Sequence, residues 1–457
     1  MLTVSLALTL LVLIVSGCKT TPTPRNVLLI SIDSLRADHL GVYGYGRDTS
    51  PVIDALARGG VRFSETLSPT SWTLPAHVTL LTGRTQENHR TIRPEDHIGD
   101  SETLLAEIFS RHGFETAGLY SGPFLDRSFG FDRGFDRYVS CMSKLTSIQK
   151  GFSRLNSSHR DTTNPCLAEK FAEWLHSRGD KPFFALVHMW DVHYDYLPPA
   201  EYRKIFDTGY TGELTGRRIA FEGFPLDASP RDVAFLKSLY DGELRYTDAT
   251  IGHMLELLHE RALLRDTLVV VTADHGEEFL EHGGKGHKRT LYHEVIHVPL
   301  IFNGPGVPAG KVIDAPVSLA DVAPTILRMT GLPVPGNVDG HDLSPRFRSQ
   351  AAASPPVFGA LYLPSKNDRD TYVPRITMAR TNDRKLLYDY ETKTWEEYDL
   401  TRDPGEKHPL PPDDALRGEL SQFLAKAEGS LQTRQAATQD PVPAQVEERL
   451  RALGYIE

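Results

Sequence analysis

The chain has 457 residues, of which 40% are hydrophobic and 24% are charged, and its formal net charge at pH 7 is −10. This length and apolar content suffice for a large buried core, arranged as one domain with an appendage or as two domains. The modest acidic balance, without a basic patch in the sequence, argues against nucleic acid as a partner.

The first 17 residues form an apolar segment that we interpret as a signal peptide. Residues 1–15 carry no charge, and the run is too short for a comfortable membrane span. The Val-Ser-Gly-Cys sequence at 15–18 resembles a bacterial lipoprotein signal, although no Lys or Arg precedes the apolar run. We expect an exported protein on the periplasmic or surface side of the bacterial cell envelope, anchored to the membrane by lipid on Cys18 or by the uncleaved segment. Residues 18–25 form the expected tether.

Cysteine usage is compatible with export. If Cys18 carries lipid, Cys141 and Cys166 remain. In an oxidising compartment these two thiols could form a disulfide. Two buried free thiols are an equally good interpretation, so the sequence leaves the pairing open.

The folded body opens with a buried strand that ends in an acid. Residues 26–33, Asn-Val-Leu-Leu-Ile-Ser-Ile-Asp, are apolar without alternation, which favours a strand buried on both faces of a parallel sheet. In open α/β sheets, ligands collect beyond the carboxyl ends of the strands, so Asp33 is a candidate metal ligand. Capping of the following turn is its alternative role. The sequence then predicts a helix from Pro51 to Ala57.

Thr73 lies where the next helix is expected to begin. Pro75 follows two places on, as is common in a first helical turn, and a helical run extends from Ala76 to Leu81. A hydroxyl at this place faces unpaired backbone N–H groups and the positive end of the helix dipole, which favours an oxyanion. We therefore take Thr73 as a candidate nucleophile, with a simple N-cap as the alternative.

Strands and helices alternate through the rest of the first 345 residues. The polar, Arg-rich and aromatic segment 126–164 has no clear period and is expected to form loops over the site. The other predicted elements are helices at 101–109 with Ser101 as cap, 165–178 and 233–258, and strands at 114–120, 182–190, 267–273 and 298–302.

An acid and a histidine follow directly after each of two of these strands. In an extended chain residues i and i+2 point the same way, so Asp191 and His193 could reach one ion or one anion. The alternative is a polar loop whose acid only orients its histidine. Asp274, His275 and Gly276 combine an oxygen ligand, a nitrogen ligand and a residue that allows close backbone approach.

These segments stand in the order found in the sulfatase branch of the alkaline phosphatase superfamily, which the chain resembles over nearly its whole mature length. The resemblance continues through residues 318–325 and 340–343 and along a tail from 375 to 406. It implies an α/β fold with a large mixed, mainly parallel sheet between helices over residues 26–345. A small α+β subdomain with short antiparallel strands is implied for 346–457. Terminal helices are expected at 413–426 and 443–452, and a joint between the two parts at 351–356.

The chain departs from the sulfatase pattern at the nucleophile. Sulfatases of this branch carry a Cys or Ser that is converted to formylglycine, in a Cys/Ser-x-Pro-x-Arg motif. Here Thr73 stands at that position and His77 replaces the Arg, while Ser34 stands where many sulfatases have a second Asp. Threonine cannot give the formylglycine aldehyde. The resemblance therefore implies a plain hydroxyl nucleophile, as in superfamily members that act on phosphate esters through a phosphothreonine.

One metal site follows from the residue types. A threonine hydroxyl is a weak nucleophile at neutral pH, and coordination to a metal is one way to activate it. Asp33, Asp274 and His275 would supply three permanent ligands, with Thr73 as the activated group. The imidazole favours zinc or manganese, and calcium is the further possibility.

The residue types also allow a second metal site. Asp191, His193 and His287 could hold a second ion, as in two-metal phosphohydrolases. In sulfatases, by contrast, the residues corresponding to His193 and His287 hold the sulfate directly, the latter being a Lys. His77 and Lys288 are candidate anion contacts, with surface or helix-capping roles as the alternative.

Three functions remain open at this point. The first is a metal-dependent hydrolase or phosphotransferase that acts on phosphate esters of the envelope through Thr73. The second is a sulfuric ester hydrolase that works without formylglycine, and the third is a non-catalytic envelope lipoprotein. The substrate is expected to be a phosphate or sulfate ester. Its identity depends on loops such as 201–230, which carry no signature that we can interpret.

Overall fold

The computed structural model describes residues 23–142, 163–221, 223–349, 355–366, 371–432 and 444–452. The expected signal peptide, Cys18 and most of the tether therefore lie outside the described residues, as do parts of the expected joint and of the loops at 126–164. Among the helices that the structure describes, none is both long and apolar enough to cross a membrane.

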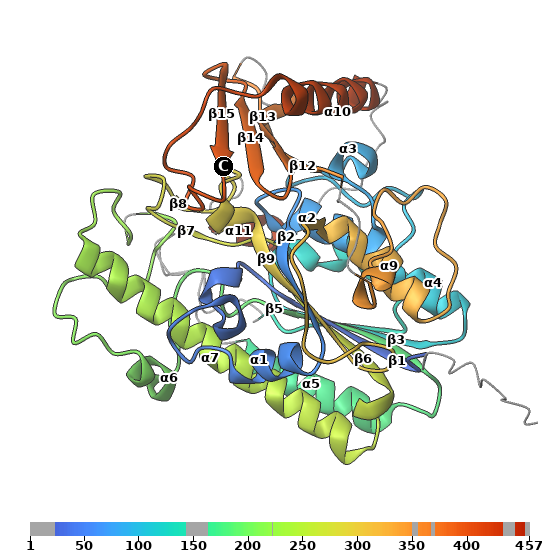
Figure 1. The fold of residues 1–457 in the computed structure, drawn as a ribbon. Helices are drawn as coiled ribbons and strands as arrows, with labels where there is room; N and C mark the ends of the chain where they lie inside the picture. The colour runs from blue at the N-terminus through green and yellow to red at the C-terminus, as the bar shows by residue number, and fades with distance from the viewer. Residues whose placement is uncertain are drawn as a thin grey trace, which may run out of the picture.

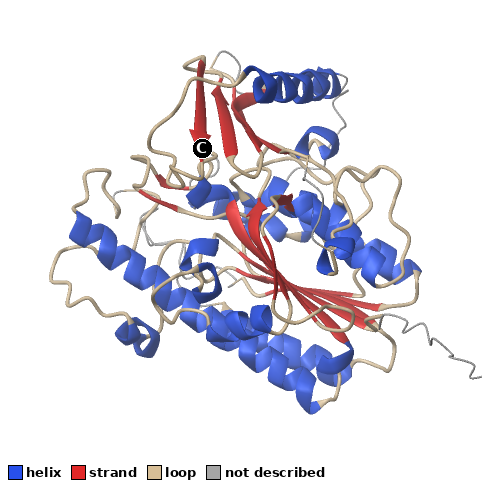
Figure 2. Ribbon diagram, in the orientation of Figure 1, coloured by secondary structure: helices blue, strands red, loops and turns tan. Residues whose placement is uncertain are grey.

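A nine-stranded sheet runs through the centre of the molecule, with helices on both of its faces (Figures 1 and 2). The strand order is β10-β2-β9-β6-β1-β5-β3-β4, and β11 pairs with β2. The β9 strand runs antiparallel to β2 and β6, and the other pairs are parallel. The expected mixed, mainly parallel sheet is thus confirmed. The strands are β1 Asn26–Ile32, β2 Val61–Leu67, β3 Glu115–Tyr120, β4 Arg137–Ser140, β5 Phe183–Met189, β6 Thr267–Ala273, β9 His297–Asn303, β10 Lys311–Ile313 and β11 Val317–Ser318.

The three central strands β5, β1 and β6 end at the same level. Every residue of these strands is buried, as their continuous apolar sequences predict. Ile32 of β1 pairs with Met189 of β5 on one side and with Ala273 of β6 on the other. The residues that follow β1 and β6 therefore leave the sheet side by side at one edge.

Helices cover the sheet in two layers, of which α1, α5 and α7 form one and α2, α4 and α9 the other (Figure 1). Helix α2 begins at Thr73, three residues before the expected helical run, and ends at Thr82, with Gly83 as C-cap at a φ of +70°. The helices are α1 Pro51–Arg58, α2 Thr73–Thr82, α3 Gln86–His89, α4 Leu105–Arg111, α5 Asn164–Ser177, α6 Ala200–Ile205, α7 Pro230–Glu260, α8 His293–Ile296, α9 Val322–Met329, α10 Asp414–Gln432 and α11 Ala444–Ala452.

The start of α4 differs from the prediction. We expected Ser101 to cap this helix, but the N-cap is Leu104. The Glu107 side chain accepts a hydrogen bond from the Leu104 backbone N–H at 2.9 Å. This bond satisfies a helix-end donor without a cap hydroxyl, so the N-cap lies three residues after the predicted Ser101.

The C-terminal part forms a separate four-stranded antiparallel sheet in the order β12-β13-β14-β15, with α10 beside it (Figure 1). The backbone N–H of Ala360 in β12 donates to the carbonyl of Pro69, which ties this sheet to the segment before α2. A short ribbon of β7 Glu278–Phe279 and β8 Lys285–Gly286 lies in sequence between β6 and β9 of the large sheet. The strands are β12 Val357–Pro364, β13 Tyr372–Arg380, β14 Arg384–Asp389 and β15 Thr394–Asp399.

Cys141 and Cys166 form a disulfide with a Cα–Cα distance of 5.6 Å. Cys141 directly follows β4, and Cys166 lies in the first turn of α5. The pairing that the sequence left open is therefore settled in favour of the disulfide. It closes a 25-residue separation and links the edge of the large sheet to a covering helix.

Candidate active site and metal centre

Four of the residues selected from the sequence meet at the carboxyl edge of the central strands. Asp33 follows β1, Asp274 and His275 follow β6, and Thr73 is the first residue of α2. All four are buried, the most exposed being Thr73 at 3%. The register of β1 with β6 places the two acids next to each other, as the strand-end argument predicts.

Asp33, Asp274 and His275 offer ligand atoms that all lie within 4.8 Å of one another. Nε2 of His275 is 3.7 Å from Oδ1 of Asp33 and 3.4 Å from Oδ2 of Asp274. The Oδ2 atoms of both acids are buried and have no hydrogen-bond donor within the part of the chain that is described. Such orphaned carboxylate oxygens are costly unless a cation faces them, so these residues fit a divalent ion.

The histidine ligand is held in one tautomer. Nδ1 of His275 lies 2.9 Å from the carbonyl oxygen of Gly276. A carbonyl only accepts, so Nδ1 carries the proton and the lone pair of Nε2 faces the acids. This is the orientation that a metal-binding imidazole needs.

Thr73 aims its hydroxyl at the same centre. Oγ1 of Thr73 lies 3.3 Å from Nε2 of His275. The N-cap of α2 is Trp72, so Thr73 occupies the first helical position and does not serve as a simple cap. Burial raises the pKa of Asp33 to about 6, while His275 and hydrogen bonds from Ser34 and Thr73 oppose this rise. A bound cation would return the carboxylate to its ionised form.

Ser34, which stands in place of a further acid, orients both carboxylates. Its hydroxyl donates to Oδ1 of Asp33 at 3.1 Å, and its backbone N–H donates to Oδ1 of Asp274 at 3.2 Å. The backbone of Ser34 is left-handed, with φ at +57°, and this turn brings the N–H toward β6. The serine thus supplies donors where the resemblance predicted a missing ligand.

His77 supports the site from behind and is not a surface residue. Its ring is fully buried; Nδ1 lies 2.9 Å from the carbonyl oxygen of Thr73, and Nε2 lies 2.9 Å from Oγ of Ser31. Burial, with His188 nearby, lowers the pKa of His77 to about 3. The expected anion contact is therefore corrected: a neutral His77 fastens the first turn of α2 to β1.

His188 was missed by the sequence analysis. Nε2 of this strand residue lies 3.5 Å from Oδ2 of Asp33, and its ring packs against that of His77 with centroids 4.5 Å apart. Burial lowers the pKa of His188 to about 4. A histidine near the end of the otherwise apolar β5 strand was the available signal. Only the strand register, which pairs His188 with Ser31, shows what it faces.

His193 and His287 continue the site as a row of rings packed edge-on or at a tilt. The His287 ring centroid is 4.3 Å from that of His275 and 5.0 Å from that of His193. Nδ1 of His287 lies 3.2 Å from Oε1 of Glu277, a buried acid that we did not select from the sequence. Burial lowers the pKa of His287 and, together with the nearby Asp33, raises the pKa of Glu277.

Asp191 does not join these histidines, so the predicted second metal site is corrected. Its carboxylate accepts hydrogen bonds from the backbone N–H of Thr163 at 2.6 Å, from the Thr163 hydroxyl, and from the backbone N–H of Asn164 at 2.9 Å. These donors lie at the start of α5, where backbone N–H groups lack partners in the helix. Asp191 is a helix cap supplied from another element.

Lys288 borders the site on the side of Trp72. Its backbone is left-handed, with φ at +63°, and its N–H donates to the carbonyl of Ser71 at 2.8 Å. Nζ lies 4.3 Å from the centroid of the Trp72 ring. Burial lowers the pKa of Lys288 to about 8. A lysine held beside the residue that precedes Thr73 is still suited to contact an anion.

Comparison with known families identifies the family of this chain. The family model described as Sulfatase matches residues 25–332, and the model described as N-sulphoglucosamine sulphohydrolase, C-terminal, matches residues 281–429. The chain belongs to the sulfatase family. It is therefore an ester hydrolase of that superfamily, which decides against the non-catalytic interpretation.

Relatives of this sulfatase-family protein are distant in sequence. Human arylsulfatase A is 25% identical over 456 residues, covering 85% of this chain and 83% of that protein. An ulvan-active sulfatase of Formosa agariphila is 26% identical over 353 residues, covering 71% of this chain and 65% of that protein.

Solved structures share the fold. A 2-O GAG sulfatase superposes with a TM-score of 0.71 at 20% identity, covering 93% of this chain and 96% of that chain. A phosphonate monoester hydrolase of Agrobacterium radiobacter also has a TM-score of 0.71, at 22% identity, and covers 92% of this chain and 99% of that chain. The expected superfamily and fold are thus confirmed.

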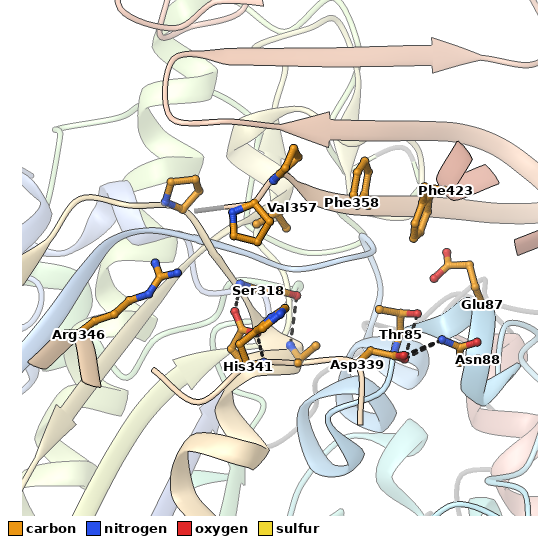
Figure 3. A pocket seen from close by; sticks show the side chains of 16 residues that line it. Thr85, Glu87, Asn88, Ser318, Asp339, His341, Arg346, Val357, Phe358 and Phe423 are labelled. Atoms are coloured by element: carbon orange, nitrogen blue, oxygen red, sulfur yellow. Dashed lines mark hydrogen bonds and ion pairs between the residues drawn. The ribbon is translucent and has the colours of Figure 1, made fainter. Parts of the chain in front are cut away.

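A cavity of about 300 Å³ lies away from the metal centre of this sulfatase-family protein, between α3 and the C-terminal sheet (Figure 3). Polar residues that line the cavity form hydrogen bonds with one another. The carboxylate of Asp339 accepts from the backbone N–H of Thr85 at 2.9 Å and from the Asn88 amide at 2.8 Å. We interpret it as a gap between packed parts.

Proposed function

We propose that this sulfatase-superfamily hydrolase cleaves or transfers phosphate esters, with the hydroxyl of Thr73 as the nucleophile. The observation that carries the proposal is the position of Oγ1 of Thr73, at the first turn of α2 and 3.3 Å from Nε2 of His275. A nucleophile needs its reacting atom beside the group that activates it. The buried carboxylate of Asp33 is the second neighbour of this hydroxyl.

The donor set of Asp33, Asp274 and His275 would hold the metal ion, and its imidazole favours zinc or manganese over calcium. When bound, a divalent ion supplies Lewis acidity, which lowers the pKa of a coordinated hydroxyl and offsets charge on phosphoryl oxygens. Ser34 and Gly276 fix the acids and the imidazole in place before a substrate arrives. The metal ligands therefore need little further ordering when the substrate binds.

The chain also offers groups for the ester itself. His193 and His287 are buried beyond the metal ligands, and Lys288 lies on the side of the Thr73 turn. The N-terminal N–H groups of α2 point toward the nucleophile and suit an anion. We assign these groups to the non-bridging oxygens of the substrate.

Phosphate is favoured over sulfate by the chemistry of residue 73. Threonine is a secondary alcohol, so its oxidation cannot yield the aldehyde on which formylglycine chemistry depends. Among structures with this fold, phosphonate monoester hydrolases of Agrobacterium radiobacter and Silicibacter pomeroyi stand beside the sulfatases. The second candidate, a sulfuric ester hydrolase without formylglycine, is favoured by the resemblance to arylsulfatase A.

A substrate panel tests this proposal. Aryl phosphate monoester, diester, phosphonate and sulfate substrates are assayed with zinc, manganese or calcium, using the parent protein, Thr73→Ala and Thr73→Ser. We expect phosphorus esters to be preferred, Thr73→Ala to lose at least about 10²-fold in kcat/KM, and Thr73→Ser to retain part of it. Thr82→Ala, at the other end of α2, is the matched control. A Thr73→Ala protein that works at the parent rate would overturn the nucleophile, and turnover of sulfate alone would favour the second candidate.

We also propose that the protein is exported and anchored at the envelope, as its first 18 residues suggest. The disulfide between Cys141 and Cys166 supports an oxidising compartment. The test is fractionation of cells that express the parent or Cys18→Ser. We expect the parent in the membrane fraction and the variant shifted out of it or left as uncleaved precursor. A parent protein that is found in the cytosol would contradict the proposal.

A further inference from the structure

A second group of metal-binding residues lies outside the active site described above. Residues 293–297 read His-Glu-Val-Ile-His, a His-Glu-x-x-His sequence that the proposed reaction does not use. Two histidines four residues apart on a helical turn lie on one face, a spacing typical of zinc sites. Here the segment is the single turn α8, which passes into β9 at His297. The two imidazole centroids are 4.3 Å apart.

A glutamate from another strand completes the set. Glu65 of β2 lies beside both histidines, and the three residues offer ligand atoms that all lie within 4.8 Å of one another. Oε2 of Glu65 is 4.0 Å from Nε2 of His293. Two histidines and one glutamate, with an open position for water, are an established zinc ligand set. Zinc bonds of about 2.0–2.2 Å would require these atoms to close by roughly 1 Å.

The surroundings prepare these residues as ligands. Nε2 of His297 lies 2.8 Å from the carbonyl oxygen of Ser64, so Nε2 carries the proton and Nδ1 presents its lone pair. Arg380 donates to Oε2 of Glu65 at 3.1 Å and holds that carboxylate in place. Nδ1 of His293 is buried without a hydrogen-bond partner in the described part of the chain. The side chains of Glu65 and His293 are each 25% exposed, so an ion can enter from solvent.

Glu294, the central acid of the sequence, is turned away from this group. Its Oε1 lies 2.6 Å from Nδ1 of His282, and it groups with His282 and Glu278 and not with Glu65 and the two histidines. A peptidase site of this sequence pattern needs the glutamate as its general base. The geometry therefore points to metal binding without peptide hydrolysis.

We infer that Glu65, His293 and His297 form a transition-metal site, for zinc, that is separate from the active-site metal centre. The site joins β2 to the start of β9, two antiparallel neighbours in the large sheet. Arg380 reaches it from β13 of the C-terminal sheet. A bound ion would stabilise the junction between the two sheets.

Zinc titration of the full-length protein after removal of metal by a chelator tests this inference, with calorimetry as the readout and no dependence on enzyme activity. In an Asp33→Asn/Asp274→Asn background, which disables the active-site centre, we expect one zinc ion to bind. Adding His293→Gln/His297→Gln should weaken that binding at least about 10²-fold. No zinc binding by the background protein, or binding unchanged by the added substitutions, would overturn the inference.

Two further variants test whether a loss of zinc binding comes from misfolding or from the removal of surface histidines. Glu65→Gln removes one ligand charge while keeping its size, and it should weaken zinc binding at least tenfold in a protein with unchanged circular dichroism. The matched control, His253→Gln/His259→Gln, removes two exposed histidines of α7 and should leave the titration unchanged. If the control lowers zinc binding as much as His293→Gln/His297→Gln, the ion binds to surface histidines and the inference fails. The outcome is independent of whether Thr73 is the nucleophile.

Discussion

Burial pushes the titratable groups around Thr73 toward their neutral forms. It raises the pKa of Asp33 to about 6, and it lowers the pKa values of His77 and His188 to about 3 and about 4. Neutral imidazoles are ready to support or ligate a cation, and a cation beside Asp33 would favour the ionised form of that carboxylate. The buried groups around Thr73 therefore favour the binding of a divalent cation.

Asp191 is the residue whose role differs most between sequence and structure, and its substitution separates the two interpretations. Asp191→Asn keeps one acceptor oxygen but loses the charge that holds Thr163 and Asn164. We expect the free energy of unfolding to fall by about 1–3 kcal/mol, the usual cost of leaving buried donors unsatisfied. The metal content should not change, because Asp191 faces the start of α5 and not the metal ligands.

Urea unfolding and elemental analysis of the purified variant check this prediction. Asp227→Asn, at an exposed position, is the control and should alter neither quantity. A variant that unfolds like the parent but has lost metal would show that Asp191 is a ligand after all.

The sequence predicts the site residues that lie directly after a strand or at the start of a helix. Asp33 and Asp274 follow continuous apolar strands, and Thr73 precedes a helical run, so elementary rules for open α/β sheets bring them together. Asp191 was misassigned because the i, i+2 spacing shows which residues point the same way but not what they meet. The partners of Asp191 are 27 and 28 residues away in sequence. His188 was missed for the same reason.

The short helix α3 contains a buried acid whose protonation affects the stability of the fold. Glu87 on this helix is 4% exposed, and burial raises its pKa from 4.5 to about 7. The folded state therefore holds a proton that the unfolded chain releases between about pH 4.5 and pH 7. Stability contributed by this group is present below pH 4.5 and is lost as the pH rises through about 7.

Glu87→Gln should remove this loss. At pH 8 we expect the variant to be more stable than the parent by up to about 3 kcal/mol, at about 1.4 kcal/mol for each unit of pKa shift. Near pH 4 the two proteins should be equal. Urea unfolding at several pH values measures the difference, with Glu201→Gln at an exposed position as control. Parallel stability curves for parent and Glu87→Gln would contradict the prediction.

The sequence predicts the two parts of the molecule, the large sheet with its helices and the C-terminal sheet, but not the contacts that hold them together. Apolar strand patterns and the sulfatase resemblance predict the large sheet and the small antiparallel sheet, both of which the structure contains. The contacts between them depend on isolated polar residues far apart in the chain. Glu406 makes such a contact with the α8 turn, and its carboxylate also pairs with Lys385 of β14, with Nζ and Oε1 2.6 Å apart and both side chains fully buried. Nothing in their local sequence marks them as partners.

The Lys385–Glu406 ion pair also connects the C-terminal part to the rest of the molecule. Oε2 of Glu406 also accepts from the backbone N–H of His293 at 2.8 Å, so the pair ties the C-terminal sheet to the α8 turn. Removing one partner leaves the other charge buried and unpaired, so Lys385→Met or Glu406→Gln alone should destabilise the fold by about 3–5 kcal/mol. The double variant should lose far less than the sum, because it leaves no uncompensated charge.

A double-mutant cycle in urea measures this coupling. The exposed pair of Lys366 and Glu391 is the matched control, and its cycle should give less than about 1 kcal/mol because solvent screens both charges. If the two losses at Lys385 and Glu406 simply add, the residues do not act as a pair. The junction between the sheets would then depend on apolar packing, with these charges contributing independently to its stability.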